Sequence, residues 1–235
     1  MCSENANSGS GETGLSHTTD LTLSAGESDA LRLRAYVPPS STLCADAFDL
    51  MISGLPLSIV HHSLRVYLFA NWLARKEQHS WTDNESLFVA CICHDLGASQ
   101  HHNGPQRFEV EGADAAADLL RKHGKSEQEA HQVWTAIALH TSPGIAERIT
   151  PLARLVRLGV LMDFRPAIRQ EMAAVAYGAE IEAKLPRLEI EKILGGAVVN
   201  QAVQNPKKAP AASWPNNLYK SYLENPEWRG VNRAF

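Results

Sequence analysis

From about residue 41 onward, apolar residues recur three or four positions apart, and this spacing limits the fold more than any other feature of the chain. In IVHHSLRVYLFANWLARK, most apolar side chains fall on one face of a helix, as Ile59, Val66, Phe69 and Leu73 show. Alternating patterns typical of β-strands do not reach a useful length. The sequence therefore predicts an all-α bundle of about eight to ten helices.

Helix boundaries are indicated by capping residues. Thr82 and Glu85 form a capping box that opens a helix through LFVACICHDLG, and Gly97 is expected to end it. Ser126 and Glu129 form a second box at the start of a helix that runs through VWTAIALH. Further helices are expected from Gly112 to His123 with Gly124 as the stop, from Pro151 through LARLVRLGVLMDF, and over residues 166–183, 188–203 and 216–224, with loops at 98–108 and 142–150.

The two ends of the chain differ in character. Residues 1–30 are rich in Ser, Gly, Thr, Asn and Glu, so they bury too little apolar surface to offset the cost of ordering. We expect a flexible N-terminal tail there. Residues 31–235 are expected to form one domain with a C-terminal helical extension.

Composition narrows the function classes. A net charge of −4 over 235 residues provides no basic field for nucleic acid and no polybasic signal for a membrane surface. No apolar stretch approaches the roughly 20 residues that span a bilayer, and the N-terminus lacks a secretory signal. The four cysteines show neither the usual zinc spacing nor a disulfide framework. We expect a soluble, cytoplasmic protein with reduced thiols and a small-molecule substrate.

The segment CICHDLG places His94 and Asp95 together at the end of an apolar run. Burying a polar group without a partner costs roughly 2–7 kcal/mol, so this pair needs compensation. A cation that accepts an imidazole and a carboxylate provides it. The alternative is an aspartate at a helix end that pairs with its own histidine or with a nearby arginine. Most of the ten histidines need no special role.

The wider pattern resembles the HD-domain superfamily. HHSLRVY places a histidine on a preceding helix, and LGVLMDF ends a later helix in an aspartate. The resemblance implies an all-α HD-domain bundle and four metal ligands, which are His62, His94, Asp95 and Asp163. His61 competes with His62, but family members carry the ligand directly before Ser, which favours His62.

Departures from the family pattern bear on the number of metals. Many HD proteins hold two metals and add two histidines, of which IALHTSPG provides one, His140. The other position falls in RFEVEGADAA, which contains no histidine, so a single-metal site is expected. One divalent ion is implied, with zinc preferred because the chemistry is not redox, and with iron as the alternative.

A closer resemblance is to the cyanamide hydratase branch of HD proteins, through HHSLRVY, CICHDLG, RFEVEGA, AIALH and VLMDF in that order. It implies a hydratase or hydrolase of a small nitrogen-containing molecule. In the branch reaction, metal-bound hydroxide attacks a C≡N group, as in the conversion of cyanamide to urea.

Several residues are candidates for roles around that reaction. Asp95 is expected to touch the metal and hold the proton of the water, and the pKa of His140 is expected to suit a proton shuttle. Arg107, Phe108, Glu109 and Thr141 are candidate substrate-binding residues. The alternatives are structural: a helix-end histidine, a polar helix-end threonine, and an acidic residue that stabilises a helix N-terminus.

Two other functions stay open. An HD-type phosphohydrolase acting on a nucleotide or small phosphate ester needs cations near the metal, for which Arg65, Arg107 and Arg148 are candidates. A binding or scaffold module with a structural metal, or with none, is the third interpretation. Residues 188–203 offer either a homodimer contact or simple core packing, and core packing is preferred.

Overall fold

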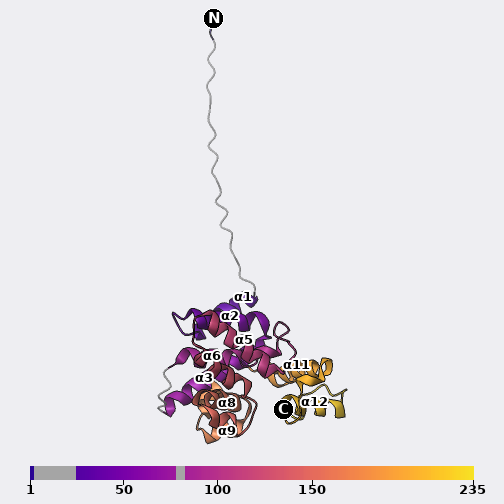
Figure 1. Ribbon diagram of the computed structural model, residues 1–235. Coiled ribbons are helices and arrows are strands. Elements are labelled where there is room, and N and C mark those ends of the chain that lie inside the picture. Colours follow the sequence, from indigo (N-terminus) through magenta and orange to yellow (C-terminus); the bar gives the residue numbers. More distant parts are fainter. Residues whose placement is uncertain (3–24, 78–82) are drawn as a thin grey trace.

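The computed structural model describes residues 1–2, 25–77 and 83–235, and within them every regular element is a helix (Figure 1). The predicted all-α class is confirmed. The α-helices are α1 (Ala25–Leu33), α2 (Thr42–Gly54), α3 (Leu57–Lys76), α4 (Asn84–Cys93), α5 (Phe108–Lys122), α6 (Glu127–Ala138), α7 (Ala146–Ile149), α8 (Pro151–Phe164), α9 (Pro166–Glu171), α10 (Val175–Lys184), α11 (Ile190–Gln204) and α12 (Trp214–Glu224). Short 3-10 helices are η1 (Arg34–Tyr36), η2 (Leu96–Ala98) and η3 (Pro206–Lys208).

Helix α4 forms the centre of the bundle. Every residue from Ser86 to Cys93 is buried, because the sequence SLFVACIC presents small or apolar side chains in all directions. Helices α2, α3, α5, α6 and α8 pack around it. The side chain of Asp83 caps its first turn by accepting from the amide of Ser86, whereas the predicted cap, Thr82, lies outside the described residues. This central helix delivers the next two residues, His94 and Asp95, into the interior.

Helices α3 and α8 lie antiparallel and in close contact. Val66 faces Gly159, where a Cβ atom would lie only 2.7 Å from the Val66 carbonyl oxygen. At the other end of the pair, Arg154 forms an ion pair with Glu77. Because glycine lets the two backbones approach, the first turns of α3 lie beside the last turn of α8.

Helices α5 and α6 form an antiparallel hairpin. Gly124 adopts a left-handed conformation with a φ of 73° directly after the C-cap residue of α5, as expected for a glycine stop. The predicted capping box of Ser126 and Glu129 opens α6. The hairpin places the N-terminus of α5 beside the residues that follow α6.

The segment after α4 corrects one prediction. Helix α4 ends at Cys93, and Gly97 lies in η2 instead of serving as the C-cap. A Cβ atom at Gly97 would lie 2.0 Å from the Phe108 carbonyl oxygen and 2.9 Å from the Gly112 amide nitrogen. The glycine is therefore needed because the backbone of α5 passes directly against η2.

The C-terminal half departs from the predicted boundaries. The stretch predicted as one helix over 166–183 is broken into α9 and α10, and Ala173 adopts a left-handed φ of 56° at the break. In Figure 1, α11 and α12 lie to one side of the bundle with the C-terminal end beside them. The buried face of α11 packs in the core, as preferred for residues 188–203.

At the N-terminal end, residues 3–24 of the predicted tail lie outside the described residues. Helix α1 begins at Ala25, so the last part of the expected tail is helical. None of the described helices has the length and apolar character to span a bilayer. All four cysteines are free thiols, and Cys44, Cys91 and Cys93 are buried.

Candidate metal centre

Three predicted ligands meet inside the bundle. His62 comes from the second turn of α3, His94 from the C-cap of α4, and Asp95 directly follows it. All three are buried, and one ligand atom from each lies within 4.8 Å of the others. His140, from the turn after α6, is buried beside them, with its ring centroid 4.9 Å from that of His94.

Backbone contacts fix the tautomers of two of these histidines. His94 Nδ1 lies 2.7 Å from the Cys91 carbonyl oxygen, and His140 Nδ1 lies 2.7 Å from the Ile137 carbonyl oxygen. A carbonyl oxygen only accepts, so each Nδ1 carries the proton and donates. In the neutral ring, each Nε2 therefore holds a lone pair that is available to a metal.

His62 follows the same pattern with a carboxylate in place of the carbonyl. Its Nδ1 lies 2.7 Å from Asp163 Oδ2, and its Nε2 lies 3.1 Å from His94 Nε2. When Nδ1 donates to the carboxylate, the two facing Nε2 atoms both present lone pairs. Two lone pairs at this distance repel each other unless a proton or a cation lies between them.

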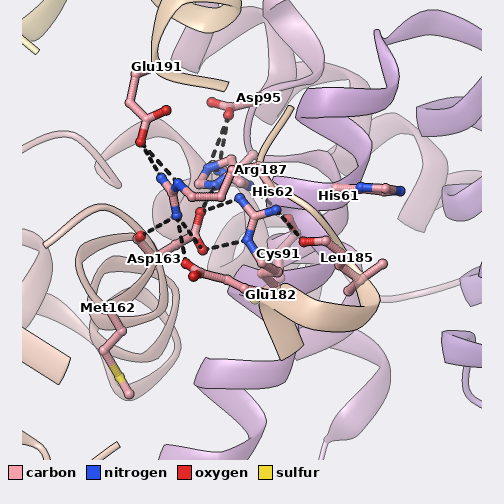
Figure 2. Close-up of polar contacts among 12 residues, drawn as sticks. His61, His62, Cys91, Asp95, Met162, Asp163, Glu182, Leu185, Arg187 and Glu191 are labelled. Carbon is pink, nitrogen blue, oxygen red and sulfur yellow. Dashed lines mark hydrogen bonds and ion pairs between the residues drawn. The ribbon is translucent and has the colours of Figure 1, made fainter. Parts of the chain in front are cut away.

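Asp95 completes the set. Both of its carboxylate oxygens are buried and make no hydrogen bond to the described residues. Its Oδ2 lies 3.5 Å from His62 Nε2 and 3.3 Å from His94 Nε2, and its Oδ1 lies 3.6 Å from His140 Nε2. Figure 2 shows the Asp95 carboxylate pointing toward the His62 ring. Two imidazole nitrogens and a carboxylate without donors match the ligands that zinc prefers.

The charges at the site follow from this crowding. Burial opposes a charged His94, but the Asp95 carboxylate outweighs burial and raises the pKa of His94. Burial would raise the pKa of Asp95, but the neighbouring His94 imidazole holds that pKa well below its usual range. Burial lowers the pKa of His140 to about 3 and the nearby His94 adds to the shift, so His140 is neutral at neutral pH instead of titrating there as expected.

Asp163 lies on the far side of the His62 ring. Arg65 Nε donates to its Oδ1 over 2.7 Å, and Arg65 Nη2 donates to its Oδ2 over 2.8 Å. Both oxygens are thus engaged, and Asp163 is not among the grouped ligand atoms. The Asp163 carboxylate therefore holds the tautomer of His62 through Nδ1, and direct ligation of a metal by Asp163 stays a prediction.

A second guanidinium, from Arg187, holds the backbone of Asp163. Arg187 Nη1 donates to the Asp163 carbonyl oxygen over 2.8 Å and pairs with Glu182, while its Nη2 pairs with Glu191 (Figure 2). Arg65 in turn donates to the Leu185 carbonyl oxygen over 3.0 Å. The segment after α10 is thereby tied to the far side of His62.

His61 does not take part in the cluster. Its Nδ1 donates to the Pro186 carbonyl oxygen over 2.9 Å, and in Figure 2 its ring points away from Asp95. Neighbouring residues of a helix point about 100° apart, which separates it from His62. The choice of His62 over His61 agrees with this geometry.

A cavity of about 450 Å³ opens onto the four clustered side chains. Its walls carry aromatic residues from both halves of the chain, including Phe164, Trp214 and Phe235. Trp214 and Phe235 pack edge to face with ring centroids 5.4 Å apart. Arg157 also lines the cavity and donates to the His140 carbonyl oxygen over 3.0 Å, which fixes the turn that carries His140.

The four predicted substrate-binding residues separate into two pairs. Arg107 and Thr141 line the cavity, whereas Phe108 and Glu109 are buried behind its described lining. Glu109 accepts from Arg107 Nη2 and from the Thr141 hydroxyl, each over 2.6 Å, and it touches no histidine ring by hydrogen bond among the described residues. The Thr141 hydroxyl thus donates to Glu109 and not toward the cavity. Phe108 packs its ring against His140, with centroids 5.6 Å apart.

The sequence did not indicate some of these contributors. Arg65 lies one turn after His62 on the same face of α3, a spacing that could have linked it to the site, although it was considered only as a phosphate ligand. Trp214 and Phe235 lie 119 and 140 residues after Asp95, and no spacing pattern connects them to it.

Comparison with known proteins agrees with this geometry. A search of curated proteins finds no match. Residues 59–159 match the family model described as HD domain, and this range contains His62, His94, Asp95 and His140. Residues 59–159 therefore form an HD domain, the domain that defines a superfamily of metal-dependent hydrolases.

Proposed function

We propose that the protein is a single-metal hydratase or hydrolase in which His62, His94 and Asp95 hold a divalent cation, with zinc as the preferred ion. One observation carries the proposal: imidazole Nε2 atoms face one another at 3.1 Å beside a buried carboxylate without a donor. A proton on one ring would relieve only part of the repulsion among these groups. Only a cation engages both nitrogens and the carboxylate at once.

When bound, such a cation lowers the pKa of water and polarises a substrate atom. The chain provides the rest of the chemistry. The Asp95 oxygen that faces His140 Nε2 at 3.6 Å is suited to orient the attacking water through its proton. Neutral His140 presents a lone pair toward the same point and can accept a hydrogen bond from that water, which helps to orient it.

Asp163 and Arg65 act as positioning residues in this scheme. The carboxylate keeps the proton of His62 on Nδ1, so that Nε2 stays free to bind the cation. The guanidinium of Arg65 keeps Asp163 charged and oriented.

For the substrate, we propose a small molecule with a nitrile-like C≡N group. Its hydration adds one water: the oxygen bonds to carbon, both protons end on the product, and the C≡N group becomes an amide. Cyanamide, which gives urea, is a small compound of this kind, and its use rests on the resemblance to cyanamide hydratases. A cavity of about 450 Å³ with aromatic walls also accommodates a nitrile that carries an apolar group.

Phosphate ester hydrolysis is the second candidate, and one residue favours it. Arg165 lines the cavity, where its Nη2 donates to the Phe235 main-chain oxygen over 2.8 Å. No acidic side chain pairs with it among the described residues, so its guanidinium can also face an anion. The arginines predicted for this role are engaged elsewhere. Arg65 is buried against Asp163, Arg107 is paired with Glu109, and Arg148 donates to a backbone carbonyl.

The test is to incubate zinc-loaded protein with cyanamide, benzonitrile and p-nitrophenyl phosphate and to measure urea, benzamide and nitrophenol. We expect urea or benzamide from the wild type and from a His61→Asn control, and neither product from His94→Ala. Nitrophenol alone would select the phosphohydrolase. Turnover that persists in His94→Ala would contradict the proposed role of His94. No turnover of any compound with metal bound would also contradict the proposal, and it would favour a scaffold.

A further inference from the structure

A second cavity of about 770 Å³ lies between α11 and the segment that follows α12. Its floor includes the turn between α2 and α3 and the residues after η2. It shares no lining residue with the candidate metal cavity among the described residues. The proposed function makes no use of it.

The charge of this cavity differs from that of the chain. Lys192, Arg229 and Arg233 line it, and none of its described lining residues is acidic, although the chain has a net charge of −4. No ion pair involves Arg229 or Arg233 within the described residues, and the Arg233 guanidinium lies over the Trp228 ring instead. Lys192 pairs with Glu189 at 3.5 Å, but both side chains are about half exposed or more, at 47% and 71%, so that pair is weak. The cavity is therefore positively charged.

The two arginines project from a turn that is built around one ring. Trp228 Nε1 donates to the Val231 carbonyl oxygen over 3.0 Å. A Cβ atom at Gly230 would lie 2.8–2.9 Å from atoms of the indole, so the glycine lets the backbone lie on the ring. The Arg233 guanidinium lies over the same ring, 5.0 Å from its centroid. The Arg233 guanidinium is therefore held against the indole of Trp228.

The remaining polar lining consists largely of amides. Asn200 and Gln204 come from α11, Gln100 follows η2, and Asn225 follows α12. Each amide offers both donors and acceptors. Beside them, Gly196 leaves the helix surface bare, since a Cβ atom there would meet nothing within 4 Å. The cavity thus combines fixed positive charge with groups that bind hydroxyl or carbonyl oxygens.

We propose that this second cavity is a binding site for a small organic phosphate, such as a phosphorylated sugar or nucleoside. A phosphate group provides the multiple charged acceptors that two unpaired guanidinium groups match. The amides bind the polar body of the same ligand. The size of the cavity suits a metabolite of that kind, which is larger than an inorganic ion.

The test is isothermal titration of the full chain, dialysed against chelator, with ribose 5-phosphate, inorganic pyrophosphate and unphosphorylated ribose. Metal-free protein removes phosphate binding at the metal. We expect saturable binding of ribose 5-phosphate, weakened by a factor on the order of ten or more in Arg229→Ala/Arg233→Ala. The control is Arg121→Ala/Lys122→Ala, which removes two charges from the exposed end of α5 and is expected to bind like the wild type.

Other results would overturn the proposal. They are the absence of saturable binding, equal weakening in both double variants, and binding of ribose as tight as that of its phosphate. Binding that survives in Arg229→Ala/Arg233→Ala but is lost in Arg165→Ala would assign the ligand to the metal cavity instead. Thermal melting of each variant separates loss of binding from loss of fold. Because catalysis is not measured, the result is independent of the proposed hydratase.

Discussion

The ion pair between Arg65 and Asp163 predicts a large loss of stability when the guanidinium is removed. Both side chains have no exposed surface, and Arg65 makes two hydrogen bonds of 2.7 and 2.8 Å to the carboxylate. Replacement by methionine keeps much of the volume but leaves Asp163 with His62 Nδ1 at 2.7 Å and a distant Arg187 at 3.5 Å. The Leu185 carbonyl oxygen also loses a donor.

The magnitude follows from burial. Removal of one partner of a buried ion pair costs about 3–5 kcal/mol, and a carbonyl left without a donor adds about 1 kcal/mol or more. We therefore expect Arg65→Met to lower the free energy of unfolding by about 4–6 kcal/mol. Because a whole domain is stable by only about 5–15 kcal/mol, this variant will be close to unfolding.

The same two helices provide a matched control. Arg154 and Glu77 form an arginine–carboxylate pair at the other end of α3 and α8, but their side chains are 30% and 28% exposed. Arg154→Met is expected to cost only about 0.2–1 kcal/mol. Urea denaturation of both variants, followed by circular dichroism, measures the difference if the m-values agree.

A double variant separates the lost pair from general damage to the core. Arg65→Met/Asp163→Leu removes both charges, so it is expected to be more stable than Arg65→Met alone. If Arg65→Met costs no more than Arg154→Met, the reasoning from burial is refuted. If the double variant is less stable than Arg65→Met by the full cost of a second mutation, the two residues are not coupled.

Two further predictions concern packing and pH. Gly97→Ala is expected to cost roughly 1–3 kcal/mol, because its Cβ would lie 2.0 Å from the Phe108 carbonyl oxygen. Gly196 lies inside α11, where a Cβ atom would meet nothing within 4 Å, so in the same urea titration Gly196→Ala is expected to stabilise the protein by about 0.5–1 kcal/mol. Equal effects would contradict that argument. Glu85→Gln is expected to destabilise the protein by about 0.2–1 kcal/mol at pH 7, because the hydrogen bond from the Ser41 hydroxyl lowers the pKa of Glu85 in the folded state. That contribution is present above the pKa of Glu85 in the unfolded state and is lost as the pH falls through its pKa in the folded state. Melting scans at pH 7 and pH 3 will therefore show that the difference in stability between wild type and variant shrinks at low pH. A difference that stays constant would contradict this prediction.

The sequence predicted the helical class and the ligand-bearing elements because both depend on local patterns. The apolar run that ends at His94 predicts a helix whose end is buried, and the capping box at Ser126 predicts where α6 begins. Local patterns do not determine how close two helices approach. Gly97 does not end a helix; it permits contact between η2 and α5. This role depends on the backbone of Phe108, which lies 11 residues later in the sequence.

In the candidate site, too, local patterns predict some features and contacts between distant residues determine the others. The type of ligand could be read from His62, His94 and Asp95, but the position of Asp163 depends on Arg65, whose guanidinium occupies both carboxylate oxygens. The titration of a side chain also depends on burial. The shift in the pKa of His140 follows from its burial, which no residue near it in the sequence indicates.

The aromatic residues that line the metal cavity could not be predicted from the sequence for a different reason. Trp214 and Phe235 belong to the C-terminal extension, and they line the cavity only because the chain after α11 folds back against it. Such long-range contacts leave no periodic signal in the sequence. Because these residues line the cavity, its size could not be predicted from the sequence.

The most direct measurement is the metal content of the purified protein and of matched variants, determined by inductively coupled plasma mass spectrometry after gel filtration. We expect about one divalent ion per chain, zinc in preference to iron, in the wild type and in His61→Asn, and a small fraction of that in His94→Ala and Asp95→Ala. A wild type that binds no divalent ion when zinc is supplied, or an Asp95→Ala variant with undiminished metal, would contradict the account.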